Sequence, residues 1–211
     1  MNKVFFDLEW NTGFMDGNSF DEIIEIGAVK TDEEYRQIDG FRRLIRPVIY
    51  RKMNPYIQKI LAITMKDLQG EEPLAAVAKV FFDWCGDCDT LIAWSGNDFG
   101  VLEKNLAHIG MKIPEQLGRY DVQMAYAYRT ENSIRNYALK TAVEAMELPE
   151  PEGQEYHDAY CDAQFTAAIG RALTERYGPL PAVEELQALK NPLVKPKKPK
   201  LPLIYSVKKA I

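Results

Sequence analysis

The segment that most constrains the fold is residues 4–10, VFFDLEW, where two acidic side chains interrupt an apolar run. The run is apolar enough to be a buried strand. Side chains two positions apart on a strand point to the same face, so Asp7 and Glu9 would lie side by side. Burying two carboxylates is unfavourable unless they are paired or coordinated to a metal. Either the strand ends at Glu9 and leaves both acids in water, or partners elsewhere in the chain complete a site.

Apolar spacing along the chain predicts early strands followed by alternating helices and strands. We expect strands at residues 4–10, 23–30, 35–46 and 90–94 and near 120, the third broken near Asp39 and Gly40. We expect helices at residues 55–63, 65–68, 97–109, 133–146, 158–177 and 182–189 and another after Pro73, with Thr64 and Ser133 as N-caps. This order predicts an α/β fold. Its mixed sheet is antiparallel over the first three strands and parallel beyond them, with helices on both faces.

Length and composition fit a soluble globular protein. The 211 residues suffice for one domain, expected over residues 1–178, with an extension over residues 179–211. No run approaches the roughly 18 apolar residues of a membrane span, and the chain starts without a secretory signal. Three cysteines, an odd number, favour a reducing cytoplasm over a disulfide framework. The net charge of −5 does not suggest bulk binding of nucleic acid, but it allows a protein that grips only a chain end.

The last segment, residues 190–211, differs in composition from the rest of the chain. It holds seven lysines and no acidic residue, and four prolines at positions 192, 196, 199 and 202 favour an extended chain. It is either a solubilising tail or a basic arm that holds a phosphate backbone or a partner protein near an acidic domain.

A third acid, Asp98, follows the strand expected at residues 90–94. The sequence WSGNDF at residues 94–99 reads as a strand end, a turn of small residues and the start of a helix. Ligands gather at strand ends of this kind in open α/β sheets. An acid in a first helical turn also complements the helix dipole, so Asp98 could have a purely structural role.

A fourth acid, Asp162, lies early in the last long helix, and His157 precedes it by five positions. Five residues turn a regular helix by about 140°, so the two side chains cannot serve one site if both are helical. His157 must therefore lie on the loop before the helix, where Asp158 is the expected N-cap. The alternative is a loop histidine without a task.

The chemistry of these residues indicates a metal site. Four carboxylates from three separate stretches, without Cys or His among the ligands, favour Mg²⁺ or Mn²⁺ over Zn²⁺. Two such ions about 3.5–4 Å apart can clamp a phosphodiester, one activating a water and the other stabilising the leaving oxygen. A neutral histidine beside that water can take its proton. The expected ligands are Asp7, Glu9, Asp98 and Asp162.

Three stretches together resemble the exonuclease motifs of the DEDDh 3′–5′ exonucleases. They are Asp7-Leu8-Glu9, Asn97-Asp98-Phe99, and His157 followed after four residues by Asp162-Ala163, in the same order and at similar separations. Residues 24–29, IEIGAV, also resemble the second strand of that family, and the likeness spans about residues 2–175. The motifs are weak individually and specific only as a set.

The resemblance implies an RNase H-like fold and the release of nucleoside 5′-monophosphates from a 3′ end with two divalent cations. It implies that the four carboxylates bind these cations and that His157 is the general base. The sister group, with tyrosine as the base, would place Tyr four residues before Asp162. That position is Asp158, so the histidine subclass is favoured.

The sequence departs from the family pattern at two points. Many members have Thr after the glutamate, where this chain has Trp10. The indole could stack on the terminal base or belong to the core, and Leu8 and Trp10 are the candidate substrate-binding residues. Ser95 and Gly96 replace the His-Asn often found before the second motif. Neither change affects a proposed ligand.

Three further features need an interpretation: a cysteine pair, a second histidine and a basic cluster. Cys85 and Cys88 imitate a thioredoxin motif, but they follow a helix and precede a strand, where a thiolate is disfavoured. A zinc knuckle would need a second ligand pair. His108 lies within an expected helix. A basic cluster could contact substrate phosphates or belong to a solvated edge strand; its members are Arg42, Arg43, Arg46, Arg51 and Lys52.

The leading hypothesis is therefore a metal-dependent 3′–5′ exonuclease acting on the 3′ end of single-stranded RNA or DNA, in the cytoplasm and away from membranes. Discrimination at the 2′-OH depends on local geometry, so the sequence leaves RNA and DNA open. A second hypothesis is a proofreading subunit whose basic tail binds a polymerase or another protein. A third is a non-catalytic nucleic-acid-binding module on the same fold.

Overall fold

A computed structural model describes residues 1–13, 20–149 and 156–189. Five strands form one sheet in the order β3-β2-β1-β4-β5, with β1 paired antiparallel to β2 and parallel to β4. β2 and β3 are antiparallel, and β4 and β5 are parallel. The mixed sheet predicted from the sequence is confirmed. The strands are β1 Lys3–Thr12, β2 Asp21–Thr31, β3 Gln37–Leu44, β4 Thr90–Ala93 and β5 Gly118–Asp121.

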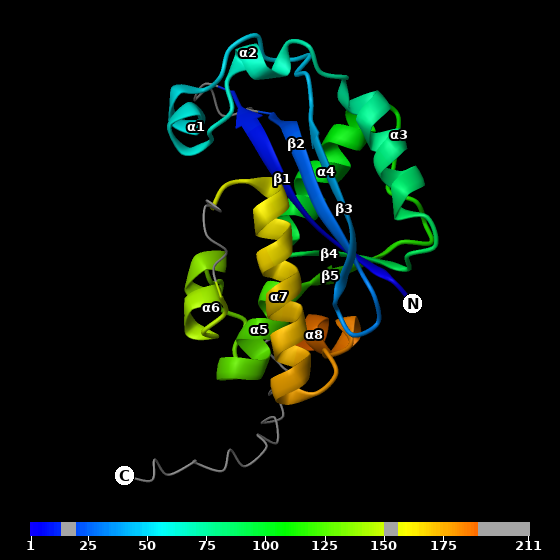
Figure 1. The fold of residues 1–211 in the computed structure, drawn as a ribbon, viewed down its shortest axis with the longest axis vertical. Coiled ribbons are helices and arrows are strands. Elements are labelled where there is room, and N and C mark those ends of the chain that lie inside the picture. The colour runs from blue at the N-terminus through cyan, green and yellow to red at the C-terminus, as the bar shows by residue number, and fades with distance from the viewer. Residues whose placement is uncertain (14–19, 150–155, 190–211) are drawn as a thin grey trace.

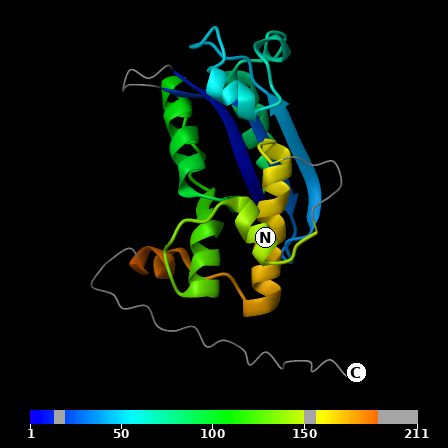
Figure 2. The same cartoon turned by 90° about the vertical axis from the view of Figure 1, so that its left-hand side faces the viewer.

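Helices cover both faces of this sheet (Figures 1 and 2). They are α1 Pro55–Ile60, α2 Met65–Leu68, α3 Leu74–Cys85, α4 Gly96–His108, α5 Val122–Glu131, α6 Leu139–Ala145, α7 Ala159–Tyr177 and α8 Val183–Leu189. α3 and α4 lie on one face, and α7 crosses the other face beside α5 and α6. Among the described residues, no helix is both long and apolar enough to cross a bilayer.

The alternation of side chains along β1 decides which helices its two faces meet. Val4, Phe6 and Leu8 belong to the core with α3 and α4. Phe5 belongs to the core with α5, α6 and α7. Because side chains alternate along a strand, Asp7 shares the face of Phe5 and looks toward α7. Asp7, the first acid of the pattern, therefore faces α7, which carries the last acid, Asp162.

α7 approaches the sheet closely because a cross-strand row contains a glycine. In the register of the sheet, Asp7 on β1 pairs with Gly27 on β2, which pairs with Arg42 on β3. A Cβ atom on Gly27 would lie 2.1 Å from the backbone nitrogen of Tyr160, in the first turn of α7. The missing side chain leaves the space in which this turn rests, so the start of α7 sits directly beside Asp7.

α1 lies beside the end of β1 (Figure 1), and polar contacts fix the segment before it. The side chain of Asn11 accepts a hydrogen bond from the backbone N–H of Asn54 at 2.8 Å and donates one to the carbonyl of Lys52 at 3.0 Å. The buried carboxylate of Glu22 accepts hydrogen bonds of 2.5–2.8 Å from three consecutive backbone N–H groups, those of residues 48–50. The segment before α1 is thus anchored to the sheet.

Several predicted boundaries were wrong. Ser133 does not cap a helix to Met146, because α5 continues to Glu131 and ends at Asn132, whose φ of 51° is left-handed. Residues 132–138 connect α5 to α6, which begins at Leu139. The helix expected at 55–63 ends at Ile60, since Leu61 is extended.

Two predicted caps are confirmed. The backbone N–H of Thr64 donates to Asp67 Oδ2 at 2.8 Å in a capping box, and Oδ1 of Asp158 accepts from the backbone N–H of Cys161 at 3.0 Å.

The helix predicted near residue 182 is α8, and it packs on the main domain. Its Leu186 is buried with the α5–α7 core, and Tyr128 on α5 donates a hydrogen bond to Glu185 at 2.8 Å. The basic tail over residues 190–211 lies outside the described residues.

Candidate active site

The seven site residues predicted from the sequence line one cleft of about 320 Å³ at the C-terminal end of β1. β1 supplies four of them, the start of α4 supplies one, and the loop and first turn of α7 supply two. The predicted residues in the cleft are Asp7, Leu8, Glu9, Trp10, Asp98, His157 and Asp162. Segments far apart in the sequence therefore meet as expected.

The carboxylates on β1 have no cationic partner among the described residues. Asp7 and Glu9 are both half-buried, and neither forms an ion pair in that part of the chain. Glu9 lies opposite Glu25 in the β1–β2 register, so a third acid flanks the pair. The register shifts between Glu9 and Trp10, which marks a β-bulge at the edge of the cleft. Bulges often re-aim a side chain next to a functional site.

Asp98 is held by the turn that starts α4. Ser95 is the N-cap: its Oγ accepts from the backbone N–H of Asn97 at 3.3 Å and donates to Asp98 Oδ2 at 3.2 Å. Asp98 is only 6% exposed although it lines the cleft. The serine that departs from the family pattern thus orients the carboxylate that follows it.

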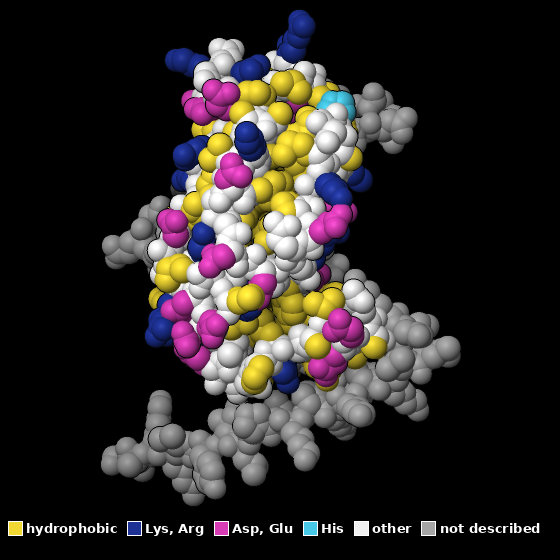
Figure 3. Space-filling model, turned by 90° about the vertical axis from the view of Figure 1, so that its right-hand side faces the viewer, with side chains coloured by type: hydrophobic (Ala, Val, Ile, Leu, Met, Phe, Trp, Pro, Cys, Tyr) yellow, Lys and Arg dark blue, Asp and Glu magenta, His cyan; other side chains and the backbone are white. Residues whose placement is uncertain are grey.

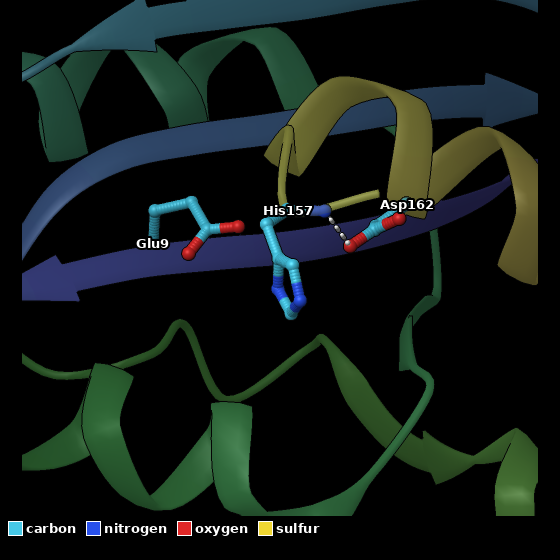
Figure 4. Close-up of side chains that lie close together, drawn as sticks. All are labelled: Glu9, His157 and Asp162. Atoms are coloured by element: carbon cyan, nitrogen blue, oxygen red, sulfur yellow. Dashed lines mark hydrogen bonds between the residues drawn. The ribbon is translucent and has the colours of Figure 1, made fainter. Parts of the chain in front are cut away.

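His157 lies on the loop before α7, as the five-residue spacing predicted. Its φ of 68° is left-handed, which is uncommon for a residue with a side chain. Its backbone N–H donates to Asp162 Oδ2 at 3.2 Å, and the side chain is exposed. One ligand atom each from Glu9, His157 and Asp162 lie within 4.8 Å of one another, with the three side chains grouped over β1 (Figure 4).

Burial and mutual repulsion raise the pKa of every carboxyl group in the cluster. For Asp7 the pKa lies well above its ordinary value, because of burial first and the charges of Asp98 and Asp162 next. Burial, reinforced by Asp162, raises the pKa of Glu9 to about 8. Burial raises the pKa of Asp162 to about 7 and that of Asp98 to about 6. The negative charges of this cluster are therefore not compensated by nearby positive charge in the described part of the chain.

The donors fit a hard divalent cation. All four carboxylates offer oxygen, the ligand that Mg²⁺ and Mn²⁺ prefer. Oδ1 of Asp162 is buried and has no hydrogen-bond partner within the described part of the chain. Buried polar atoms normally have a partner, and a missing one suggests an ion or water.

Sequence reasoning missed an ion-pair network next to this cluster. Nε of Arg42 on β3 donates to Oε1 of the fully buried Glu25 at 2.8 Å. The guanidinium also pairs with Asp158, the N-cap of α7, at 2.5 Å. A glutamate within the apolar run IIEIG was the available signal, because a buried acid requires a partner.

An apolar wall from α1 was also missed. Ile57, Ile60 and Leu61 line the cleft opposite the carboxylates, together with Trp94 and Leu139. Trp10 lines the cleft and also packs against the core with α3 and α4, so stacking of its ring on a base stays a prediction. The cleft thus pairs a charged floor with apolar sides.

The other patterns are structural. Cys85 and Cys88 are buried, and burial raises the pKa of Cys85 to about 12, which opposes thiolate chemistry. His108 packs against Phe20 with the ring centroids 5.4 Å apart. In the described ranges, only Glu9, His157 and Asp162 form a His/Cys/Asp/Glu group suited to a metal.

Comparisons with known proteins agree with this geometry. The model of the RNase_T family, described as "Exonuclease", matches residues 4–169. The PolC-type DNA polymerase III of Clostridium perfringens is 29% identical over 169 residues; the match covers 79% of this chain and only 11% of the polymerase. The nuclease domain of 3′hExo, a DEDDh family member solved with bound rAMP, superposes with a TM-score of 0.76 at 16% identity, covering 85% of this chain and 94% of that one. Escherichia coli exonuclease I in complex with a dA16 oligonucleotide gives 0.64 at 18% identity, covering 83% and 41%.

Proposed function

The chain belongs to the RNase_T exonuclease family, as its resemblance to the DEDDh enzymes predicted, and we propose that it is a metal-dependent 3′–5′ exonuclease of single-stranded nucleic acid. The observation that carries the proposal is the convergence of four carboxylates and a histidine in one cleft. The proposed exonuclease domain spans residues 1–178, with residues 179–211 as an extension.

Asp7, Glu9, Asp98 and Asp162 would hold two divalent cations, Mg²⁺ or Mn²⁺. When bound, these cations would polarise the scissile phosphodiester and make the attacking water more acidic. The raised pKa values of the carboxyl groups support this role, since a nearby dication stabilises the charged forms that burial disfavours. The buried, unpartnered Oδ1 of Asp162 would gain its missing contact.

His157 would act as the general base. Its loop position brings a ring nitrogen near the carboxylates of Glu9 and Asp162 while its exposed side keeps contact with solvent. Neutral imidazole can accept the proton of the attacking water and pass it to bulk solvent. The left-handed backbone and the hydrogen bond to Asp162 fix the residue in this position.

The terminal nucleotide would lie between the end of β1, which carries Trp10, and the apolar wall of α1. Leu8, the other candidate on β1, is 2% exposed because its side chain packs in the core with α3 and α4, so Trp10 would supply the side-chain contact. Apolar and aromatic side chains favour an unpaired base, which can stack where a duplex would not fit. Neighbouring folds were solved with rAMP and with a dA16 oligonucleotide, so both RNA and DNA are substrates to test.

The experiment is hydrolysis of a 5′-labelled oligonucleotide, as single-stranded DNA and as RNA, with Mn²⁺, Mg²⁺ or EDTA. A ladder shortened from the 3′ end, nucleoside 5′-monophosphate as product and full inhibition by EDTA are the expected results. Asp98→Asn is the inactive control. Binding without metal and without cleavage would favour the alternative of a non-catalytic binding module.

A second candidate is a proofreading exonuclease that works with a polymerase. The match to a PolC-type polymerase favours it, although the chain spans 11% of that relative. The basic tail over residues 190–211 would then bind the polymerase. Co-purification of a polymerase that depends on this tail would support the role, and a free, fully active protein would count against it.

A further inference from the structure

The basic segment, defined here as residues 40–66, contains seven Lys or Arg residues and no acidic residue. The structure separates six of these cations into two groups, and the seventh, Lys66, directly precedes Asp67 in α2. Arg42 pairs with Glu25, Arg43 donates to the carbonyl of Arg42 at 2.8 Å, and Arg46 donates to the carbonyl of Glu71 at 3.1 Å. By contrast, three exposed cations have no partner among the described residues: Arg51, Lys52 and Lys59.

The unpaired cations belong to the segment that leads into and forms α1, whose Ile57 and Ile60 line the cleft, while Arg51 lines a separate hollow. Asn11, which bonds the carbonyl of Lys52, lies two residues beyond Glu9, about 7 Å along a strand. Tyr56, on the helix whose Ile57 and Ile60 line the cleft, is 69% exposed. Lys and Arg side chains protrude at the end of the molecule where α2 lies (Figure 3).

We propose that Arg51, Lys52 and Tyr56 bind the strand on the 5′ side of the scissile bond, which rests on the proposed exonuclease function. An acidic cleft repels a polyanion, so the strand needs positive charge close to the entrance. Arg51 and Lys52 would neutralise phosphates, and Tyr56 would stack on a base without regard to sequence. The anchoring by Glu22 and Asn11 keeps this surface in place.

The test compares Arg51→Gln/Lys52→Gln with a matched control, Lys104→Gln/Lys112→Gln on and just after α4. Binding of a labelled single strand is followed by fluorescence anisotropy against salt in the hydrolysis-deficient Asp98→Asn background. Losing two phosphate contacts should flatten the slope of log K against log salt by about 1.4, and the control should not. With native Asp98, hydrolysis of a mononucleotide nitrophenyl ester should be unchanged. An unchanged salt slope would overturn the proposal. Failure of the wild type to hydrolyse either substrate would instead overturn the proposed function.

A different observation carries a second inference. Arg42 bridges Glu25 on the sheet and Asp158 at the start of α7, at 2.8 and 2.5 Å. Oδ1 of Asp158 caps α7 through Cys161, and the next residue back is His157. Arg42 and His157 also line one hollow of about 410 Å³. The contacts therefore run from β3 to the residue beside the proposed base.

We infer that Arg42 is a positioning residue for His157 and keeps the carboxylate of Glu25 turned away from the metal ligands. Breaking a half-buried pair by removing the cation leaves a buried charge that must find another partner. Glu25 would then reorient toward any nearby cation, and Asp158 would lose one of its two contacts. Both changes would loosen the loop that carries His157.

Histidine NMR tests this inference without any turnover, because the chain contains only two histidines. In Arg42→Gln, the imidazole signal of His157 should shift or broaden, while that of His108 stays in place as the internal control. The rate constant kcat should fall by about 10- to 100-fold, as for other outer-shell contacts. The loss should nearly vanish in a His157→Ala background, since residues in one network are not additive. Arg42→Gln/Glu25→Gln removes both charges and protects the fold if the single variant is unstable. An unchanged His157 signal in these variants, or fully additive losses, would overturn the inference.

Discussion

The backbone N–H of His157 donates a 3.2 Å hydrogen bond to Oδ2 of Asp162, five residues farther along the chain. The two oxygens of the Asp162 carboxylate therefore have different environments. Oδ2 holds the loop, and Oδ1 remains buried and unpartnered among the described residues. A ligand on Oδ1 would therefore be coupled directly to the position of His157, so that base and metal site respond together to a change in either.

Asp162→Asn should abolish hydrolysis but keep the fold. The amide oxygen can still accept from His157, whereas the charge needed by the cations is gone. We expect a loss of more than about 100-fold, the upper end for outer-shell contacts. The metal-free variant should unfold at a higher temperature than the wild type, because a repelling buried charge is removed. Asp83→Asn, an exposed acid on α3, is the control for both measurements. Near-normal turnover in Asp162→Asn would contradict the ligand assignment.

His157→Ala should lose about 10²- to 10⁴-fold in kcat, the range for general-base catalysis. Calorimetric titration with Mn²⁺ should show metal binding retained, because the carboxylates remain. The pH–rate profile should differ from that of the wild type, because the proposed proton acceptor is gone. His108→Gln should change none of these properties. A wild-type profile in His157→Ala would mean that the proton goes elsewhere.

The stability of the metal-free protein should fall as pH rises. Burial raises the pKa of Glu9 from 4.5 to about 8 and that of Asp162 from 3.8 to about 7. At pH values between the ordinary and the raised pKa of each group, the folded state holds a proton that the unfolded chain has released. The free energy of unfolding therefore decreases as pH rises. The contribution of these two groups to stability is fully present below their ordinary pKa values. It is lost as pH rises through their raised pKa values in the folded state. Thermal unfolding in EDTA should show this decline, and saturating Mn²⁺ should reduce it. A melting temperature in EDTA that is flat or rises over this interval would contradict the charge repulsion described for the site.

Gly27→Ala should be destabilising and inactivating. The added Cβ would meet the backbone of α7 at 2.1 Å, which no side-chain movement can relieve. Overpacking typically costs about 1–3 kcal/mol, and a backbone clash belongs at or above the upper end. Gly100→Ala on α4 meets nothing within 4 Å and should be neutral or gain about 0.5–1 kcal/mol. Chemical denaturation of both variants checks the difference. Equal stability would mean that α7 can move away from the sheet without loss.

Local spacing was sufficient to predict much of the site. Alternation places Asp7 and Glu9 together, helix geometry forces His157 onto a loop, and a strand end followed by small residues opens the helix at Asp98. These inferences need only neighbours in the sequence. The role of each residue in catalysis stays a proposal.

Two of the features that escaped prediction depend on contacts between distant segments, and a third depends on the backbone conformation of one residue. The pairing of Arg42 with Glu25 follows from the β2–β3 register, which no local pattern fixes. The wall formed by α1 depends on a hydrogen bond between Asn11 on β1 and Asn54, which precedes α1 and is separated from Asn11 by β2 and β3. The break between α5 and α6 depends on the left-handed conformation of Asn132, which Asn tolerates but does not require.

Because α7 packs directly on Gly27, the cleft can be completed only at a certain stage of protein synthesis. Asp7, Glu9 and Asp98 leave the ribosome well before the helix that carries Asp162, and a domain generally folds as a unit. Until this helix emerges, the nascent chain holds three of the four carboxylates without the fourth or the histidine. The cleft can therefore be completed only after α7 has emerged and docked across β1 and β2, so the growing protein remains incompetent until residues 159–177 have left the ribosome.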